Sequence, residues 1–147
     1  MSTLTQTVLK ISIDYVQSLE AMVRAGKYNY ANDDITAANF PPQGSGKARL
    51  EAILVQFGRY VDSDEVLAEM EKNGLRAGTL AELLALGAQH PNAQKEGDIV
   101  ALGSVWQFPG GDRRVPYLWD DGSERLLSLY WFGRGWGGRC RFLAFRK

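Results

Sequence analysis

The sequence has few of the residues on which disulfide bonds, metal sites and cysteine–histidine catalysis depend. Its 147 residues include one cysteine, Cys140, and one histidine, His90. A single cysteine cannot form an intramolecular disulfide, which argues against a disulfide-stabilised secreted scaffold. Because no cluster of histidines and cysteines is present, no metal site is expected. His90 lies in a polar stretch typical of a helix end, so a catalytic pair with Cys140 is disfavoured.

Long apolar runs are also missing. No window approaches the roughly 18 consecutive apolar residues that a transmembrane helix needs, so no membrane insertion is expected. Residues 1–7 lack a basic segment followed by an apolar stretch, which argues against a secretory signal. We therefore predict a soluble, cytoplasmic protein. Its length and its 45% hydrophobic content are sufficient for one domain with a hydrophobic core.

Neither sign of charge predominates, because the chain has 17 basic and 17 acidic residues. The charges are nevertheless unevenly distributed. Residues 1–99 carry 9 basic and 13 acidic side chains, whereas residues 100–147 carry 8 basic and 4 acidic ones. Two interpretations are open. The two parts attract each other within the fold, or the C-terminal part favours an anionic partner.

The N-terminal segment has the pattern of a strand followed by a short helix. Residues 8–15 alternate apolar and polar side chains, which predicts a strand. Ser18 is a suitable N-cap for a helix that continues to Ala25. The Pro/Gly-rich stretch at residues 41–46 predicts a loop. We therefore assign residues 1–47 to a strand–helix extension with a Pro/Gly loop, packed on the domain that follows.

Two helices are predicted in the middle of the chain, after a strand at residues 48–57. Asp62 and Thr79 are each followed three residues later by a glutamate, which is the pattern of a capping box at a helix N-terminus. Gly74 ends the first helix, and the second ends before Pro91.

The period changes to two in the C-terminal part of the chain. Strands are predicted at residues 98–107, 114–119, 124–132 and 139–146, with turns at 108–112 and 120–122. The last strand is apolar on both faces, which indicates a central position in the sheet. Two helices followed by an antiparallel meander define an α+β fold.

Three segments resemble the family of C-type-lectin-like domains. Residues 66–85 resemble its two-helix stretch, in which the first helix ends at a glycine and a threonine begins the second. Residues 100–106 resemble its core strand, which has a hydrophobic–glycine pattern, and residues 141–147 resemble its closing strand. The resemblance covers residues 48–147. It implies that the closing strand pairs with the first strand of the domain, at residues 50–57.

The chain departs from two branches of that family. Calcium-dependent lectins use a Glu-Pro-Asn or Gln-Pro-Asp tripeptide and a Trp-Asn-Asp tripeptide, and neither is present. The available acidic residues, Asp112, Asp120, Asp121 and Glu124, have the pattern of solvated turns, so calcium is not expected. The paired cysteines of secreted lectins and of formylglycine-generating enzymes are also missing. No cofactor is expected.

What remains is a similarity to the variable proteins of diversity-generating retroelements, which end in a C-type-lectin-like domain. The resemblance implies diversified positions near the C-terminus on a surface that faces the ligand. Residues 126–130 and 133–140 consist largely of the amino acids that adenine-directed mutation of Asn-type codons yields. Trp131 and Trp136 cannot arise in this way and would be fixed framework.

The candidate ligand-binding residues are aromatic, arginine and serine side chains of the C-terminal part. Tryptophan, tyrosine and arginine dominate binding hot spots because they combine a large apolar area with a polar or charged group. We predict an exposed patch that contains Tyr117, Trp119, Ser128, Tyr130, Arg134, Trp136 and Arg139. The remaining large aromatic residues of this part are predicted to lie in the core, namely Trp106, Trp131, Phe142 and Phe145.

These observations predict a non-catalytic protein that binds a protein or a surface ligand. Two other functions stay open. The arginine–aromatic patch is compatible with single-stranded nucleic acid, although the zero net charge and the absence of a known nucleic-acid motif argue against it. The acidic residues are compatible with a small hydrolase, although no nucleophile–base pair is recognisable, so we predict that the chain is not an enzyme.

Overall fold

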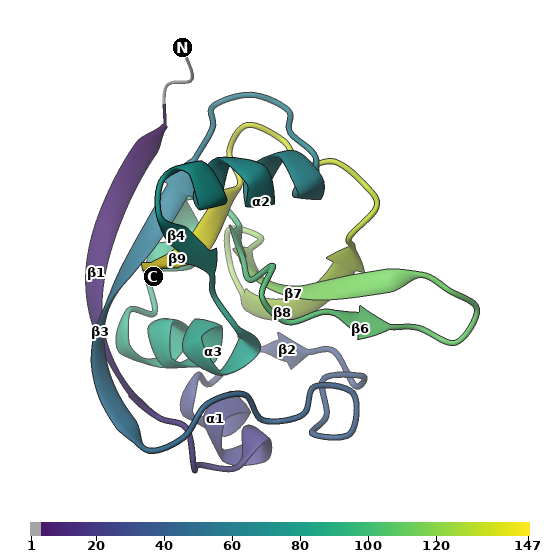
Figure 1. Ribbon diagram of the computed structural model, residues 1–147. Coiled ribbons are helices and arrows are strands. Elements are labelled where there is room, and N and C mark those ends of the chain that lie inside the picture. The colour runs from purple at the N-terminus through teal and green to yellow at the C-terminus, as the bar shows by residue number, and fades with distance from the viewer. Residues whose placement is uncertain (1–3) are drawn as a thin grey trace.

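A computed structural model describes residues 4–147, which form helices on both faces of one sheet (Figure 1). The elements in chain order are β1 (Thr5–Asp14), α1 (Leu19–Ala25), β2 (Tyr30–Ala31), β3 (Lys47–Gln56), α2 (Ser63–Lys72), β4 (Leu75–Ala77), α3 (Leu80–Gln89), the 3-10 helix η1 (Ala93–Glu96), β5 (Ile99–Val100), β6 (Trp106–Gln107), β7 (Arg113–Asp120), β8 (Arg125–Trp131) and β9 (Arg141–Arg146). The α+β class predicted from the sequence is confirmed.

The strand order of the sheet is β1-β3-β9-β5-β7-β8-β2, with β4 paired to β9 and β6 paired to β7. β9 is antiparallel to β3 and parallel to β5. Its central position confirms the prediction, since residues 142–145 are apolar and buried on both sides. The predicted antiparallel meander is only partly correct, because the β5–β9 and β2–β8 pairs are parallel.

The strand predicted at residues 98–107 is divided into β5 and β6. Between them, Gly103 packs directly against the connection from β4 to α3. Its N–H donates to the Gly78 carbonyl at 2.8 Å, and a Cβ at Gly103 would lie 2.5 Å from that oxygen. A close backbone contact of this kind requires glycine and removes the segment from the sheet.

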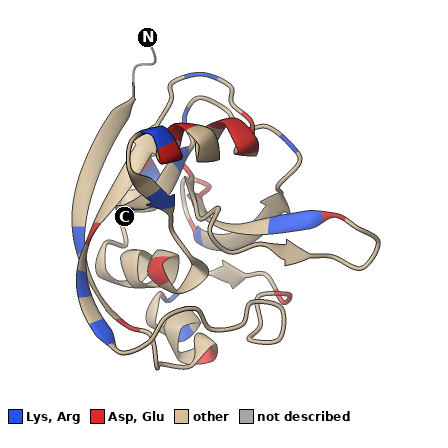
Figure 2. Cartoon of the chain, viewed as in Figure 1, with Lys and Arg blue, Asp and Glu red and all other residues tan. Residues whose placement is uncertain are grey.

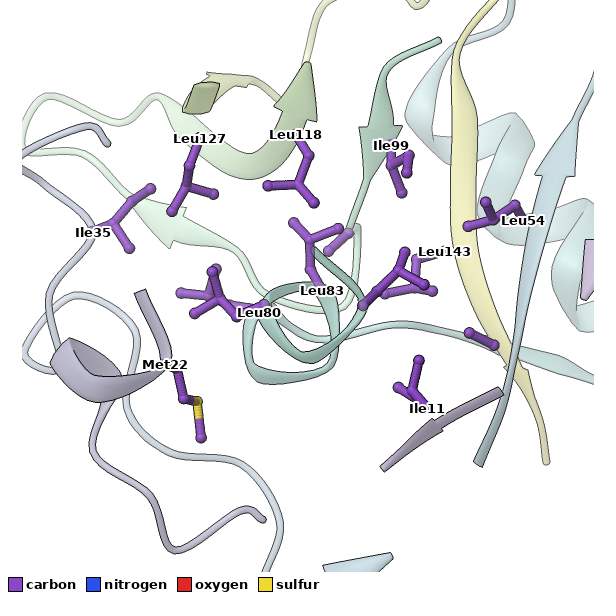
Figure 3. Close-up of a cluster of buried hydrophobic side chains, with 14 of the residues drawn as sticks. Ile11, Met22, Ile35, Leu54, Leu80, Leu83, Ile99, Leu118, Leu127 and Leu143 are labelled. Atoms are coloured by element: carbon purple, nitrogen blue, oxygen red, sulfur yellow. The ribbon is translucent and has the colours of Figure 1, made fainter. Parts of the chain in front are cut away.

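Each face of the sheet covers its own hydrophobic cluster. On one face, leucines of α3 pack against Leu118, Leu127 and Leu143, as Figure 3 shows for Leu80 and Leu83. On the other face, Val66 and Met70 of α2 pack with residues of β3, β5 and β9. Because side chains alternate along a strand, the strands β3, β5, β7 and β9 each supply both clusters. No helix within residues 4–147 is long and apolar enough to cross a membrane.

The predicted helix starts are largely correct. Ser18 caps α1 by accepting a hydrogen bond from the Ala21 N–H at 3.2 Å. Thr79 forms the full capping box, in which Glu82 accepts in return from the Thr79 N–H at 2.9 Å. Asp62 caps α2, but Glu65 accepts from Arg59 at 2.7 Å. The sequence pattern thus predicted the start of α2 and missed the arginine that competes for its glutamate.

The described part of the N-terminal segment contributes two strands, β1 and β2, to the sheet. β1 pairs with β3 along its whole length, and β2 pairs with β8 at the opposite end. The end of α3 covers the open edge of β1 at Lys10 and Ser12. The Gln89 side chain accepts from the Ser12 N–H at 2.8 Å and donates to the Ser12 carbonyl at 2.6 Å. His90 Nε2 donates to the Lys10 carbonyl at 2.7 Å.

Arg125 joins the N-terminal segment to the rest of the fold. Its guanidinium donates to the Gly26 carbonyl and, at 2.9 Å, to the Gly87 carbonyl. It also lies 4.8 Å from the centre of the Tyr28 ring. Both carbonyls belong to helices or helix ends, where a cation is favourable. Arg125 therefore has a structural role and is not part of a binding patch.

Basic and acidic residues are interspersed over the elements (Figure 2). Ion pairs link the two oppositely charged parts of the chain, through Lys147 with Glu71 and through Arg141 with Glu96 at 3.8 Å. These contacts favour the interpretation that the uneven charge is used within the fold.

Candidate functional site

Four of the predicted ligand-binding residues share one face of the β7–β8 pair. The register places Tyr117 opposite Ser128, Trp119 opposite Leu126 and Val115 opposite Tyr130. Since residues two apart on a strand point to the same side, Tyr117, Trp119, Ser128 and Tyr130 project together. All four are partly exposed. We call these four residues the aromatic face.

The rings of the aromatic face hold one another in place. Tyr117 and Trp119 are stacked, with centroids 6.4 Å apart and planes at 17°. Tyr117 meets Tyr130 edge-to-face at 6.1 Å. The Trp119 indole N–H donates to the Ser128 hydroxyl at 3.0 Å. Such contacts restrict the rotamers of the rings, so the face is preformed for binding.

Trp136 is not part of an exposed patch, and this prediction was wrong. The side chain is 3% exposed. Its indole N–H donates to the Ser63 hydroxyl at 2.9 Å, and Ser63 donates to the Phe132 carbonyl at 2.8 Å. The buried serine satisfies the indole, which makes full burial favourable. Trp136 packs beneath Tyr130 with a centroid distance of 4.7 Å and so supports the aromatic face from inside.

Arg134 and Arg139 are exposed, as predicted, but they do not lie together. Arg134 stacks on Trp131 at 4.4 Å, and the register directs Trp131 to the face opposite Tyr130. Arg134 borders an open hollow of about 450 Å³ lined by Gly111, Asp112, Arg113, Trp131, Gly133 and Arg134. Arg139 precedes β9, and its guanidinium donates to the Glu96 carbonyl at 3.5 Å. The charge of Arg139 acts on the carboxyl group of Asp98.

The aromatic residues predicted to form the core divide into two groups. Phe142 and Phe145 are buried, at 0% and 2% exposure, as expected. Trp106 and Trp131 are partly exposed. Trp106 nevertheless packs against the cluster on the α3 face of the sheet, whereas Trp131 belongs to neither cluster, so its prediction was wrong. Both tryptophans remain accessible because they belong to a ladder of rings and guanidinium groups at the sheet edge. In this ladder Arg114 lies 4.3 Å from the ring of Phe108 and 5.3 Å from that of Trp131.

Four further residues extend the aromatic face, and sequence reasoning missed them as binding residues. Ile99 pairs with both Leu118 and Arg141, so Asp98 lies one position away beside Trp119 and Cys140. Leu126 lies opposite Trp119 and also pairs with Tyr30 of β2, which is 48% exposed. One row across the sheet therefore contains Cys140, Asp98, Trp119, Leu126 and Tyr30. Asp98 and Val100 are two residues apart, so the sequence indicates that they point to the same side of the strand. The sequence does not indicate which strands lie on either side of this one.

Asp98 is a partly buried carboxylate without a close partner. Among residues 4–147, no side chain or backbone group forms a hydrogen bond or an ion pair with this carboxylate. Burial raises the pKa of Asp98, and the charges of Arg139 and Arg141 offset that rise only in part. The Asp98 charge in turn acts on Tyr117 and Cys140. A partly buried carboxylate without a partner lowers the stability of the fold unless a group of a ligand pairs with it.

Cys140 and Tyr117 are protonated at neutral pH. Burial, followed by the nearby charge of Asp98, raises the pKa of the Cys140 thiol to about 11. The same two causes raise the pKa of Tyr117 to about 12. A nucleophilic thiol requires the opposite shift. The row around Asp98 is therefore suited to binding, with Tyr117 as a neutral ring and hydroxyl donor.

The acidic residues of the β7–β8 turn hold the turn itself. Asp120 accepts a hydrogen bond from the Gly122 N–H at 2.8 Å. Asp121 accepts from the N–H groups of Ser123 and Glu124 at 2.9 and 2.7 Å, which hold its pKa below the usual value. Within the part of the chain that the structure describes, no three His, Cys, Asp or Glu side chains are grouped so as to hold a metal ion.

Comparison with known proteins provides no relative for this chain. No family model, curated protein or solved structure matches it. The functional interpretation therefore depends on the aromatic face and the row around Asp98.

Proposed function

We propose that the chain is a non-catalytic, C-type-lectin-like protein that binds a protein or surface ligand on the aromatic face. The observation that carries the proposal is that Tyr117, Trp119, Ser128 and Tyr130 come from two strands and project from one face. They are partly exposed and are fixed by mutual contacts. Rigid tyrosine and tryptophan side chains provide a large contact area at a small cost in conformational entropy.

The order of the elements supports the C-type-lectin-like part of the proposal. The strand that begins the proposed domain, β3, pairs with the closing strand β9, for example at Val55 and Phe142. Helices α2 and α3 lie between these strands in sequence, and the core strand β5 lies next to β9. Residues 1–47 then extend this domain by adding β1 and β2 to the two ends of its sheet.

The two other functions receive less support. The guanidinium groups of Arg114 and Arg134 already contact the ring of Trp131. The rings of Tyr117 and Trp119 lie beside the Asp98 carboxylate, whose negative charge would repel the phosphates of a single-stranded nucleic acid. The carboxylates of Asp120 and Asp121 are engaged by backbone N–H groups of their own turn. Because these hydrogen bonds hold them in the turn, neither carboxylate is positioned for general acid–base chemistry.

Selection of binding peptides tests the proposed site. Peptides would be selected from a displayed random library with the wild-type chain, and their affinities would be measured by calorimetry for Tyr117→Ala and Trp119→Ala. We expect a loss of at least about tenfold in each case, as for a hot-spot aromatic residue. Val16→Ala is the control, because Val16 is 78% exposed in the turn after β1. If the selected peptides bound both aromatic variants as well as wild type, the aromatic face would not be the site.

We further propose that this face is diversified in the manner of retroelement variable proteins. Ser128 and Tyr130 lie in the segment 126–140, and the buried Trp136 suits a fixed framework position. The nucleotide sequence of the gene and its flanks tests this directly. A near-copy of the 3′ end, with adenines at the differing positions and a reverse transcriptase gene nearby, is the expected result. An ordinary 3′ end without such a template would leave a binding domain of fixed specificity.

A further inference from the structure

We propose that the aromatic face binds an alkylammonium cation, namely a lysine side chain of a protein partner, between the Asp98 carboxylate and the rings of Tyr117 and Trp119. The inference rests on the proposed ligand-binding function and adds the charge of the ligand to it. It is based on three features of the row around Asp98: an unpaired carboxylate, neighbouring arginines that are engaged elsewhere, and open aromatic rings.

The first feature is the position of Asp98. The Asp98 carbonyl accepts a hydrogen bond from the Arg141 N–H at 2.8 Å, which fixes the backbone beside β9. The side chain therefore shares a sheet row with Trp119 and Cys140. It is partly buried, yet within residues 4–147 its carboxylate has no hydrogen-bonded partner. An apolar or anionic ligand on this face would bury the charge further, whereas a cation would neutralise it.

The second feature is that both neighbouring arginines are held by other groups. Arg141 is 5% exposed and donates to the Gly97 carbonyl at 2.6 Å as well as to the Ala93 carbonyl. Arg139 donates to the Glu96 carbonyl at 3.5 Å. Neither guanidinium lies within 4.0 Å of the Asp98 carboxylate, the limit for an ion pair. Both arginines act on the Asp98 carboxylate through their charge but form no ion pair with it, so its direct partner position is available to an external cation.

The third feature is the state of the aromatic rings. Tyr117 and Trp119 have nearly parallel planes, at 17°, and neither ring has an arginine stacked on it in the described chain. The rings at the other end of the hairpin differ, because Trp131 already contacts Arg114 and Arg134. A cation binds to the face of a tryptophan or tyrosine ring, most strongly where it is partly desolvated. Tyr117 and Trp119 are thus aromatic rings without a stacked arginine, next to a carboxylate without an ion-pair partner in the described chain.

The shape of the surface favours a lysine side chain over a small cationic molecule. The row lies on a strand surface, whereas small ligands are usually enclosed by their sites. A lysine side chain carries its ammonium group on a four-carbon stem, which can lie along apolar surface while the charge reaches a polar group. Leu126 and Trp119 supply that apolar surface, and Asp98 lies at its end.

Titration with short peptides, followed by ¹H–¹⁵N NMR, tests the inference. The probes are acetyl-Gly-Gly-Lys-Gly-Gly-amide and the same peptide with norleucine, which keeps the stem and lacks the charge. We expect the lysine peptide to shift the Trp119 indole N–H signal in a saturable manner, at millimolar concentrations. Its affinity should exceed that of the norleucine peptide by about fivefold or more.

Two variants test whether the Asp98 carboxylate causes the preference for lysine over norleucine. Asp98→Asn should abolish the preference for lysine over norleucine, while its NMR spectrum reports that the fold is intact. Asp121→Asn is the matched control, because Asp121 is an exposed carboxylate in the β7–β8 turn. It should retain the preference. Loss of the preference in Asp98→Asn alone would support the inference.

Three results would overturn it. Equal affinities of the two peptides for wild type would show that the face binds apolar groups, leaving the proposed function in place without the cation. An unchanged lysine preference in Asp98→Asn would show that a group other than the Asp98 carboxylate binds the cation. The absence of any saturable shift at Trp119 would exclude the lysine side chain, and the peptide selection with Tyr117→Ala and Trp119→Ala would then decide separately whether the face binds a ligand.

Discussion

Glu82 and Asp98 are both carboxylates removed from water, but their surroundings are opposite. Glu82, on α3, is 1% exposed and accepts hydrogen bonds from two nitrogens of Arg76 at 2.9 and 2.8 Å. It also accepts from the Tyr15 hydroxyl at 2.7 Å and from the Thr79 N–H at 2.9 Å. Asp98, beside the aromatic face, has no such donor within residues 4–147.

The pKa values of the two carboxyl groups express this difference. Burial alone would raise the pKa of Glu82, but the hydrogen bonds from Arg76 and Tyr15 outweigh burial and hold the pKa below the usual 4.5. Burial raises the pKa of Asp98 above the usual 3.8. A fully bonded buried carboxylate is integrated into the fold, whereas an unpaired one opposes the fold. The difference identifies Asp98 as the carboxylate that is available to a ligand.

The largest expected change in stability is at Glu82. Glu82→Gln keeps the shape of the side chain but leaves Arg76 without its counter-charge, and we expect a loss of about 2 kcal/mol in the free energy of unfolding. Denaturant unfolding measures it. Glu65→Gln is the control, since the Arg59–Glu65 pair is exposed, with side chains at 52% and 42%, and should change stability by less than about 0.5 kcal/mol. Equal losses in both variants would contradict the contrast between a buried and an exposed pair.

The second prediction concerns the pH dependence of the loss in free energy of unfolding that Glu82→Gln causes. Because the pKa of Glu82 is lower in the folded state, its contribution is complete above the unfolded value of about 4.5 and is lost as the pH falls through the folded pKa. The difference in stability between wild type and Glu82→Gln should therefore be constant near pH 7 and shrink below pH 4.5. Thermal unfolding at a series of pH values measures this difference. A deficit that grew on acidification would rule out a lowered pKa.

A smaller effect is expected at Tyr15. Tyr15→Phe removes one of the donors to Glu82, with an expected loss of about 1 kcal/mol. Burial, followed by the Glu82 contact, raises the pKa of the Tyr15 hydroxyl to about 12, so this group is a donor throughout the physiological range. Tyr60→Phe is the control, because Tyr60 is 69% exposed, and its stability in denaturant should match wild type.

The smallest effect is expected at Asp98, and it has the opposite sign. Asp98→Asn removes an unpaired charge, so the melting temperature at pH 7 should rise by about 2 °C. Since the folded pKa is raised, the destabilisation in wild type develops as the pH rises above 3.8. The advantage of Asp98→Asn should thus vanish below pH 3.8. Calorimetric scans at pH 3 and 7 measure it, and a lower melting temperature at pH 7 would mean that the carboxylate has a partner in solution.

Short-range patterns in the sequence predicted the helix starts and the alternation of side chains. Ser18, Asp62 and Thr79 cap the three helices because a cap depends on residues within one turn. The pairs Tyr117 with Trp119 and Ser128 with Tyr130 share a face because alternation along a strand is local. These rules provided four members of the candidate site.

Long-range contacts explain what the sequence did not predict. Trp136 is buried because Ser63, 73 residues earlier, receives its indole N–H. Asp98 joins the site through the antiparallel pairing of β5 with β7, and Tyr30 through the pairing of β2 with β8. Strand register depends on tertiary packing and cannot be read from one strand alone. The sequence therefore predicted the aromatic side chains but not the acidic residue that gives the face its charge preference.

The central position of β9 has a consequence for folding during protein synthesis. β9 is the last of the described strands to leave the ribosome, yet it pairs with β3, β4 and β5. Until Phe142 and Leu143 emerge, both hydrophobic clusters lack a central member. The earlier strand pair β1–β3 has an unpaired edge on β3 until then, which exposes nascent chains to association with one another. Ribosome pausing shortly before β9 would thus lengthen the interval in which the β3 edge is unpaired.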